Sequence, residues 1–201
     1  VGMAIAETLF GEGETGTMAI LVAITVPVYN VLAVLALEMF RGGRMPVKRV
    51  VKEIATNPLI IGCVCGLVTN LAGLTLPTLL FSPMDSLASA ATPVALIALG
   101  ASFHMERVSS DRRAIAVGVL MKLVLLPLAA LSVGAALGFR GVELGAMAIV
   151  FAAPTSVSSF SMAQQMGADA DLAASMVVFT GMFSCLTIFL WTFALLRLGL
   201  M

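Results

Sequence analysis

Residues that could bind a small molecule gather in one apolar stretch, between Val150 and Ser161. A proline there is followed by five hydroxyl side chains within seven residues: Pro154, Thr155, Ser156, Ser158, Ser159 and Ser161. Proline lacks an N–H and clashes with the carbonyl four residues back, so it breaks or kinks a helix. In lipid, a broken helix persists only where protein or a water-filled cavity meets the freed backbone groups. The stretch therefore predicts either the binding site of a secondary transporter or a kink whose serines bond to their own helix.

The segment after this break has the chemistry to bind a carboxylate. A half-helix that starts at the break has the positive end of its dipole there, together with free N–H groups and hydroxyl donors. Gln164 follows one turn later and could also bond to the substrate. An intramembrane serine hydrolase would instead need a base beside Ser156 or Ser158. The only histidine, His104, is predicted at the end of another span, at the wrong depth for that role.

Lys122 is the most informative single residue, because it lies near the middle of an apolar run. A charged side chain at the centre of a membrane costs at least ~2.5–3.5 kcal/mol on insertion scales, so it normally faces a cavity or a partner. Lys122 could attract an anionic substrate or replace a coupling cation. The alternative is that its long side chain reaches the membrane interface, which is far from a mid-span position.

Other polar residues within apolar runs favour packing. Asn30 and Asn70 could contact a substrate, but single amides in membrane spans more commonly form interhelical hydrogen bonds. The three cysteines lack the His or Cys partner pairs of a metal site and are interpreted as packing residues. No metal and no other cofactor is expected.

Composition places all these residues in a helical membrane protein. Hydrophobic residues form 60% of the chain and charged residues 11%, and the mean hydropathy is +1.09. A soluble domain has roughly twice that charged fraction. Runs of about 20 apolar residues recur along the chain, which predicts several membrane-spanning helices. No basic stripe suited to nucleic acid is present.

The apolar runs predict spans at 18–40, 57–76, 85–104, 114–138 and 172–196, with a broken span at 142–166. Residues 41–57 have the spacing of an amphipathic interfacial helix, and loops are expected at 77–83 and 105–113. Basic residues are concentrated in 41–57 and 105–113, whereas only Arg140 and Arg197 lie on the opposite side. By the positive-inside rule, both basic segments are cytoplasmic and the C-terminus is outside.

The same map predicts an internal repeat. A polar turn at 11–16 follows an apolar helix end, and a turn at 167–171 has the same setting about 156 residues later. The two turns are predicted on opposite sides of the membrane, so the copies are inverted. We expect residues 1–44 to be the end of a first repeat and residues 45–201 to be a complete second five-helix repeat. If the repeats match, about 110 residues precede Val1 in a protein of about ten spans.

Three stretches of the chain resemble the auxin efflux carrier family: Gly2–Gly11, Thr92–Ala101, and Ala152–Gln165 continuing into Asp169–Phe179. Together they extend over essentially the whole chain in the family's order. The resemblance implies a ten-span fold of two inverted five-helix repeats, similar to bile acid symporters and sodium/proton antiporters, with a broken helix in each repeat. Plant members export auxin as a carboxylate, and bacterial relatives are described as malate or malonate permeases. Pro154 and its hydroxyl neighbours would form the second crossover.

These inferences predict a carrier of small organic anions that works by alternating access in a bacterial inner membrane. Pro154–Ser161 would hold the carboxylate, Lys122 would make the cavity positive, and H⁺ or Na⁺ would be the coupling ion if there is one. A homodimer is left open. The alternatives are a strictly sodium-coupled carrier similar to bile acid symporters and a membrane sensor or scaffold that binds its ligand without moving it.

Overall fold

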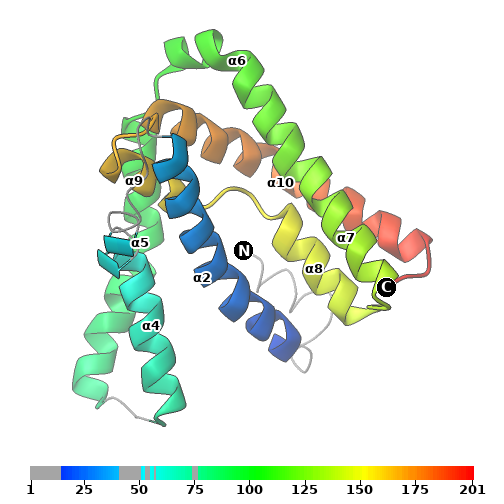
Figure 1. Ribbon diagram of the computed structural model, residues 1–201, viewed down its shortest axis with the longest axis horizontal. Helices are drawn as coiled ribbons and strands as arrows, with labels where there is room; N and C mark the ends of the chain where they lie inside the picture. Colours follow the sequence, from blue (N-terminus) through cyan, green and yellow to red (C-terminus); the bar gives the residue numbers. More distant parts are fainter. Residues whose placement is uncertain (1–14, 41–50, 53–54, 57, 74–76) are drawn as a thin grey trace. The chain divides into compact units, whose positions relative to one another are not determined.

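A computed structural model describes residues 15–40, 51–52, 55–56, 58–73 and 77–201, and every regular element in these ranges is helical (Figure 1). Among the described residues, four helices are long and apolar enough to cross a membrane: Ala19–Leu37, Thr78–Ala101, Val108–Ala136 and Ala170–Arg197. The pair Val142–Ala152 and Val157–Gln165 makes a fifth span if it is counted as one broken helix. The predicted all-α polytopic class is confirmed, whereas the inverted repeat stays a prediction.

The elements follow the apolar runs closely near the C-terminus and less closely before residue 120. In chain order they are α2 (Thr15–Phe40), α4 (Pro58–Leu71), α5 (Thr78–Ala101), α6 (Met105–Leu120), the π-helical turn η2 (Met121–Leu125), α7 (Leu126–Ala136), α8 (Val142–Ala152), α9 (Val157–Gln165) and α10 (Ala170–Arg197). The turn predicted at 11–16 and the interfacial helix predicted at 41–57 lie largely outside the described residues.

Both predicted loops are wrong. Residues 78–83 form the first turns of α5, which contains Pro83, and residues 105–113 form the first turns of α6. Neighbouring groups can compensate for the hydrogen bond that a proline removes from a membrane helix, so Pro83 does not end α5. Residues 105–113 are rich in charge, but Glu, Arg and Met are good helix formers. The charged stretch therefore continues the helix instead of ending it.

The span predicted at 57–76 is shorter than expected. It begins at Pro58, where a proline is tolerated in a first turn, but its helix ends at Leu71. Gly73 follows with φ of 62°, and its N–H donates to the carbonyl of Asn70 at 3.1 Å. Fourteen residues rise about 21 Å, less than the ~30 Å hydrocarbon core of a bilayer.

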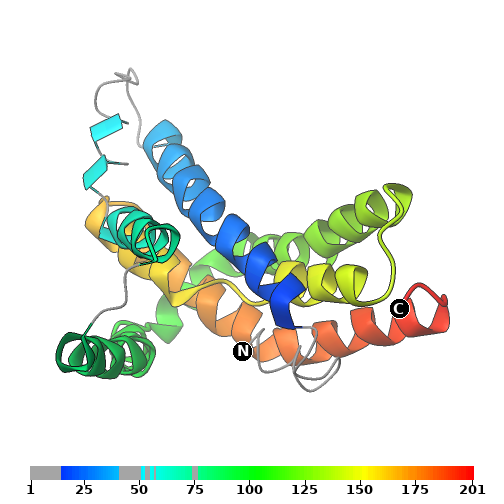
Figure 2. The ribbon, with the colours of Figure 1, turned by 90° about the horizontal axis from the view of Figure 1, so that it is seen from below.

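The described chain divides into two compact units. The first contains the described residues up to Thr25, then His104–Ser156 and Asp171–Met201. Here α7, α8 and α10 meet, as Figures 1 and 2 show, around the buried side chains of Leu131, Leu144, Ala148 and Leu195. His104 Nδ1 lies 3.8 Å from Asp171 Oδ1, so the two side chains pair ionically when the histidine is protonated. This unit carries Lys122 and Pro154.

The second unit contains the described part of Val26–Phe103 together with Val157–Ala170. Its buried centre is formed by Val34 of α2 and Met162 and Met166 in and after α9, against which Leu37 and Ile60 pack. The helix α9 also contacts α5. The α9 hydroxyls and Gln164 therefore lie on a short helix that this packing holds in place.

Candidate functional site

The candidate site begins at an interruption between two helices. The helix α8 ends at Ala152, residues 153–156 are not helical, and α9 begins at Val157. Ala153 has φ of −57° and ψ of 146°, an extended conformation that the residue before a proline favours. The two helices are bent by 43° at Pro154, as in a broken span or a re-entrant loop, so the broken span at 142–166 stays a prediction. The carbonyl groups in the last turn of α8 consequently need partners other than helical N–H groups.

The backbone of the break is anchored to α10. In a continuous helix the Thr155 N–H would bond to the Phe151 carbonyl, but here it donates to Thr180 Oγ1 at 3.0 Å. Thr180 is fully buried, and its hydroxyl donates to the Met176 carbonyl at 2.6 Å. A hydroxyl can accept one hydrogen bond while donating another, so one side chain holds the break against the closing helix.

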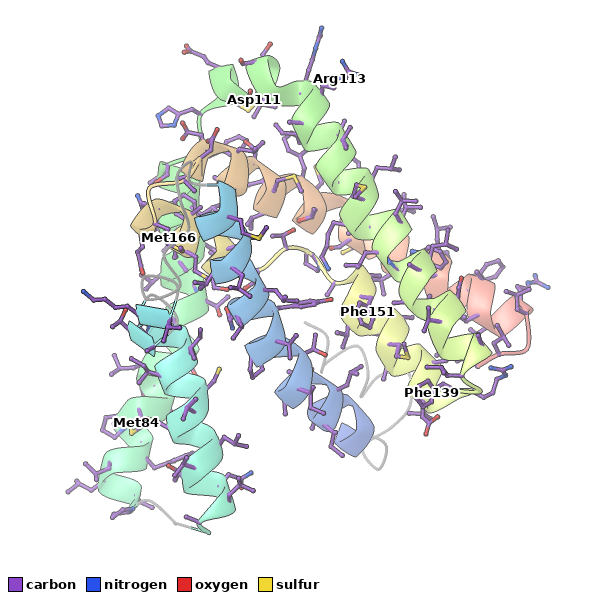
Figure 3. The ribbon with its side chains drawn as sticks, viewed as in Figure 1. Met84, Asp111, Arg113, Phe139, Phe151 and Met166 are labelled. Carbon is purple, nitrogen blue, oxygen red and sulfur yellow. The ribbon has the colours of Figure 1, made fainter. Side chains whose placement is uncertain are left out.

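Lys122 reaches the other end of the same interruption. Its Nζ donates to the Phe151 carbonyl at 3.1 Å. Phe151, labelled in Figure 3, lies in the last turn of α8. A cation is stabilised at the C-terminus of a helix by the negative end of the dipole and by the unpaired carbonyl groups. Lys122 is the central residue of the span Val108–Ala136, fourteen residues from either end. The predicted mid-span position is confirmed, and a helix end is among the groups that stabilise the charge.

A π-helical turn presents Lys122. Within Met121–Leu125 the helix widens, and the Leu126 N–H bonds to the Met121 carbonyl five residues back. Pro127 follows and cannot donate to the Leu123 carbonyl four residues before it. The Trp191 indole N–H of α10 donates to that carbonyl at 3.0 Å instead. The last helix therefore contacts both sides of the site, through Thr180 at the break and through Trp191 at the turn that carries Lys122.

Sequence analysis missed Thr180 and Trp191. Pro127 is a local signal that the Leu123 carbonyl needs a donor, and Trp191 is the only tryptophan in the chain. Buried tryptophan usually finds an acceptor for its N–H. Pro127 and Trp191 together could therefore have indicated that the indole N–H bonds to the Leu123 carbonyl. For Thr180 we find no comparable signal, because threonines in membrane helices commonly bond to their own carbonyls.

Six of the remaining predicted residues belong to the second unit, and Ser156 is an exposed residue of the first. Ser158, Ser159 and Ser161 are half-buried on α9, and Gln164 is exposed near its end. Asn30 Nδ2 donates at 3.0 Å to the Val26 carbonyl of its own helix, and Asn70 is exposed in the last turn of α4. The first unit thus brings Lys122, Pro154 and Thr155 to the end of α8, whereas the other six residues belong to the second unit.

A protein-family model described as "Membrane transport protein" matches residues 43–192, more than half of the chain. The chain belongs to this family. The match includes Lys122, the break at Pro154, Thr180 and Trp191, and it confirms the resemblance to auxin efflux carriers. No curated protein and no solved structure gives a significant match. In a membrane transport protein, a cation at mid-span beside an interrupted helix is a natural candidate for the transport site.

Proposed function

We propose that this membrane transport protein is a secondary transporter that moves small organic anions, such as malate, malonate or auxin-like carboxylates, by alternating access. The observation that carries the proposal is the contact between Lys122 Nζ and the Phe151 carbonyl at the interrupted helix. Ionisable residues inside membranes commonly mark substrate or ion pathways. The intervening residues 153–156 leave backbone groups near mid-span that can change partners as the protein opens to either side.

Lys122 would provide a positive charge in the place where other broken-helix transporters bind a coupling cation. Those transporters coordinate Na⁺ or H⁺ with unwound carbonyls and the C-terminal ends of half-helices. Here the ammonium group bonds to such a carbonyl, that of Phe151. The positive charge of Lys122 compensates the negative end of the α8 dipole, which would otherwise repel an anion. The site would therefore favour an anion. This arrangement favours a carrier without strict sodium dependence over a sodium-coupled one.

The carboxylate of the substrate would bind on the other side of the break, at the start of α9. The N-terminal end of a helix carries the positive end of the dipole, which favours a carboxylate. Thr155, Ser156, Ser158, Ser159 and Ser161 would add hydroxyl donors, and Gln164, Asn30 and Asn70 are assigned peripheral contacts. Residues 1–44 would be the end of a first inverted repeat and residues 45–201 a complete second one, in a bacterial inner membrane. Segments 41–57 and 105–113 would face the cytoplasm, and the C-terminus would lie outside.

The test is transport by the purified protein in proteoliposomes. Solid-supported-membrane currents and radiolabelled uptake would be measured after jumps of malate, malonate and indole-acetate, each with and without sodium. We expect saturable transport of at least one anion, and a reduction of about 10- to 100-fold in Lys122→Met. That reduction corresponds to losing a hydrogen bond to a charged group, worth ~1.5–3 kcal/mol.

A matched control removes the same charge elsewhere. Lys52 is exposed outside the predicted spans, so Lys52→Met should transport like the unmodified protein. Equal transport by Lys122→Met and Lys52→Met would contradict the role of Lys122. Binding of the anions without current or flux, in protein shown to be folded, would favour the sensor or scaffold instead of a carrier.

A further inference from the structure

We infer that the first unit carries a binding site for one anionic phospholipid, in an apolar groove between α6 and α10. The groove encloses about 480 Å³ and is separate from the break at Pro154. From α6 and η2 it is lined by a stripe of residues at helical spacing, which includes Ile115, Ala116 and Leu123. From α10 it is lined by Phe179, Phe183, Leu186 and Thr187.

Two contacts between the same helices hold this groove in shape. At Gly118 the absence of a side chain lets Met176 approach, since a Cβ there would lie only 2.7 Å from the Met176 Sδ and Cε atoms. Further along, Trp191 bonds to the Leu123 carbonyl. These contacts join the two helices that form the groove walls, while lining side chains such as Leu120 and Leu186 stay more than half exposed. A concave apolar surface of this kind is suited to a fatty acyl chain.

The depth of the groove matches one leaflet of a bilayer. The span Val108–Ala136 rises about 44 Å, close to the ~40–45 Å thickness of a bilayer with its headgroups. Arg112, which also lines the groove, is four residues or about 6 Å from the start of this span, at the level of the headgroups. The lining continues to Val124, about 18 Å further along the helix, compared with ~15 Å for the hydrocarbon of one leaflet.

The charge at the mouth of the groove selects the headgroup. Arg112 carries a guanidinium group, whose paired N–H donors match the oxygens of a phosphate. Its neighbours Asp111 and Arg113 lie at the same end of α6 but do not line the groove (Figure 3). Among the described residues, Arg112 is therefore the one charged side chain that lines the groove. Basic pockets between membrane helices bind anionic headgroups in this way. The proposed occupant is therefore a phospholipid with a net negative headgroup.

The test uses the fluorescence of Trp191, the only tryptophan in the chain, which touches the groove residue Leu123. The protein is reconstituted in phosphatidylcholine with increasing amounts of phosphatidylglycerol whose acyl chains carry bromine, a quencher of tryptophan. In the reverse measurement, the phosphatidylcholine carries the bromine and the phosphatidylglycerol does not. The ratio of quenching in the two series gives the preference for phosphatidylglycerol. We expect the groove to prefer phosphatidylglycerol by about fivefold, the ratio equivalent to one favourable contact between an arginine and an anionic lipid.

Three variants separate a site from general attraction to the membrane. Arg112→Gln should bring the preference close to one, whereas Arg113→Gln, which removes the same charge outside the groove, should leave it unchanged. Ala116→Phe should fill the groove and reduce quenching by both lipids. An equal loss in both arginine variants, or no preference in the unmodified protein, would overturn the inference. The result does not depend on orientation, because phosphatidylglycerol is present in both leaflets. It also does not depend on the proposed function, because no transport is measured.

Discussion

Replacing Trp191 with phenylalanine tests whether α10 stabilises the turn that presents Lys122. Trp191→Phe keeps an aromatic ring but removes the N–H that bonds to the Leu123 carbonyl at 3.0 Å. Interhelical hydrogen bonds in membrane proteins contribute about 0.6 kcal/mol on average and about 1.7 kcal/mol at most. Since Pro127 cannot donate to this carbonyl, we expect a loss in the upper part of that range.

The assay is the free energy of unfolding in mixed detergent micelles, measured together with anion transport. Thr192→Val is the matched control, because Thr192 is the next residue on α10 and its hydroxyl bonds only within that helix, to the Ile188 carbonyl at 2.7 Å. Trp191→Phe should be less stable than this control by roughly 1 kcal/mol and should also reduce transport, because Lys122 loses its fixed position.

A double-mutant cycle sharpens the test. In Pro127→Ala the new backbone N–H can bond to the Leu123 carbonyl, so Trp191 is no longer its essential donor. Trp191→Phe should therefore cost less in the Pro127→Ala background, with a coupling energy of about 0.5–1.5 kcal/mol. Equal costs in both backgrounds would refute the reasoning that Pro127 and Trp191 act on the same carbonyl.

Three further predictions concern the break and the orientation. Pro154→Ala should restore a helical N–H and reduce transport, and unchanged transport kinetics would reject the break as part of the mechanism. Thr180→Val should cost ~1–3 kcal/mol of stability because the Thr155 N–H loses its acceptor, whereas Thr180→Ser should retain most of it; equal melting of the two variants would argue against this anchor. In a cysteine-free background, Ser110→Cys should react with an impermeant thiol reagent only from the cytoplasm and Arg140→Cys only from outside, and labelling of both from one side would contradict the predicted topology.

The sequence predicts those features of the site that depend on neighbouring residues. The break was predicted from Pro154 together with the five hydroxyl residues that follow it, since a proline alone, such as Pro83, can remain inside a helix. The mid-span position of Lys122 follows from the length of the apolar run around it. The loop predicted at 105–113 failed because charge governs where a helix meets water and not whether the backbone stays helical. The partners of the freed groups could not be predicted, because Thr180 follows Thr155 by 25 residues and Trp191 follows Leu123 by 68. Pro127 indicates that a donor is needed, but only the packing of α10 determines which residue provides it.

The π-helical turn also resets the rotational phase of its span. One inserted residue rotates everything after it by about 100° relative to a regular helix. Before the turn, the lining stripe of α6 faces α10, and this stripe stops at Val124, inside Met121–Leu125. After the turn, the buried positions Leu131 and Gly134 pack against α8. A single-residue deletion within the turn would restore a regular helix and make one of these two faces point the wrong way. The extra residue is therefore what allows one continuous span to serve two different neighbours, with Lys122 at the junction.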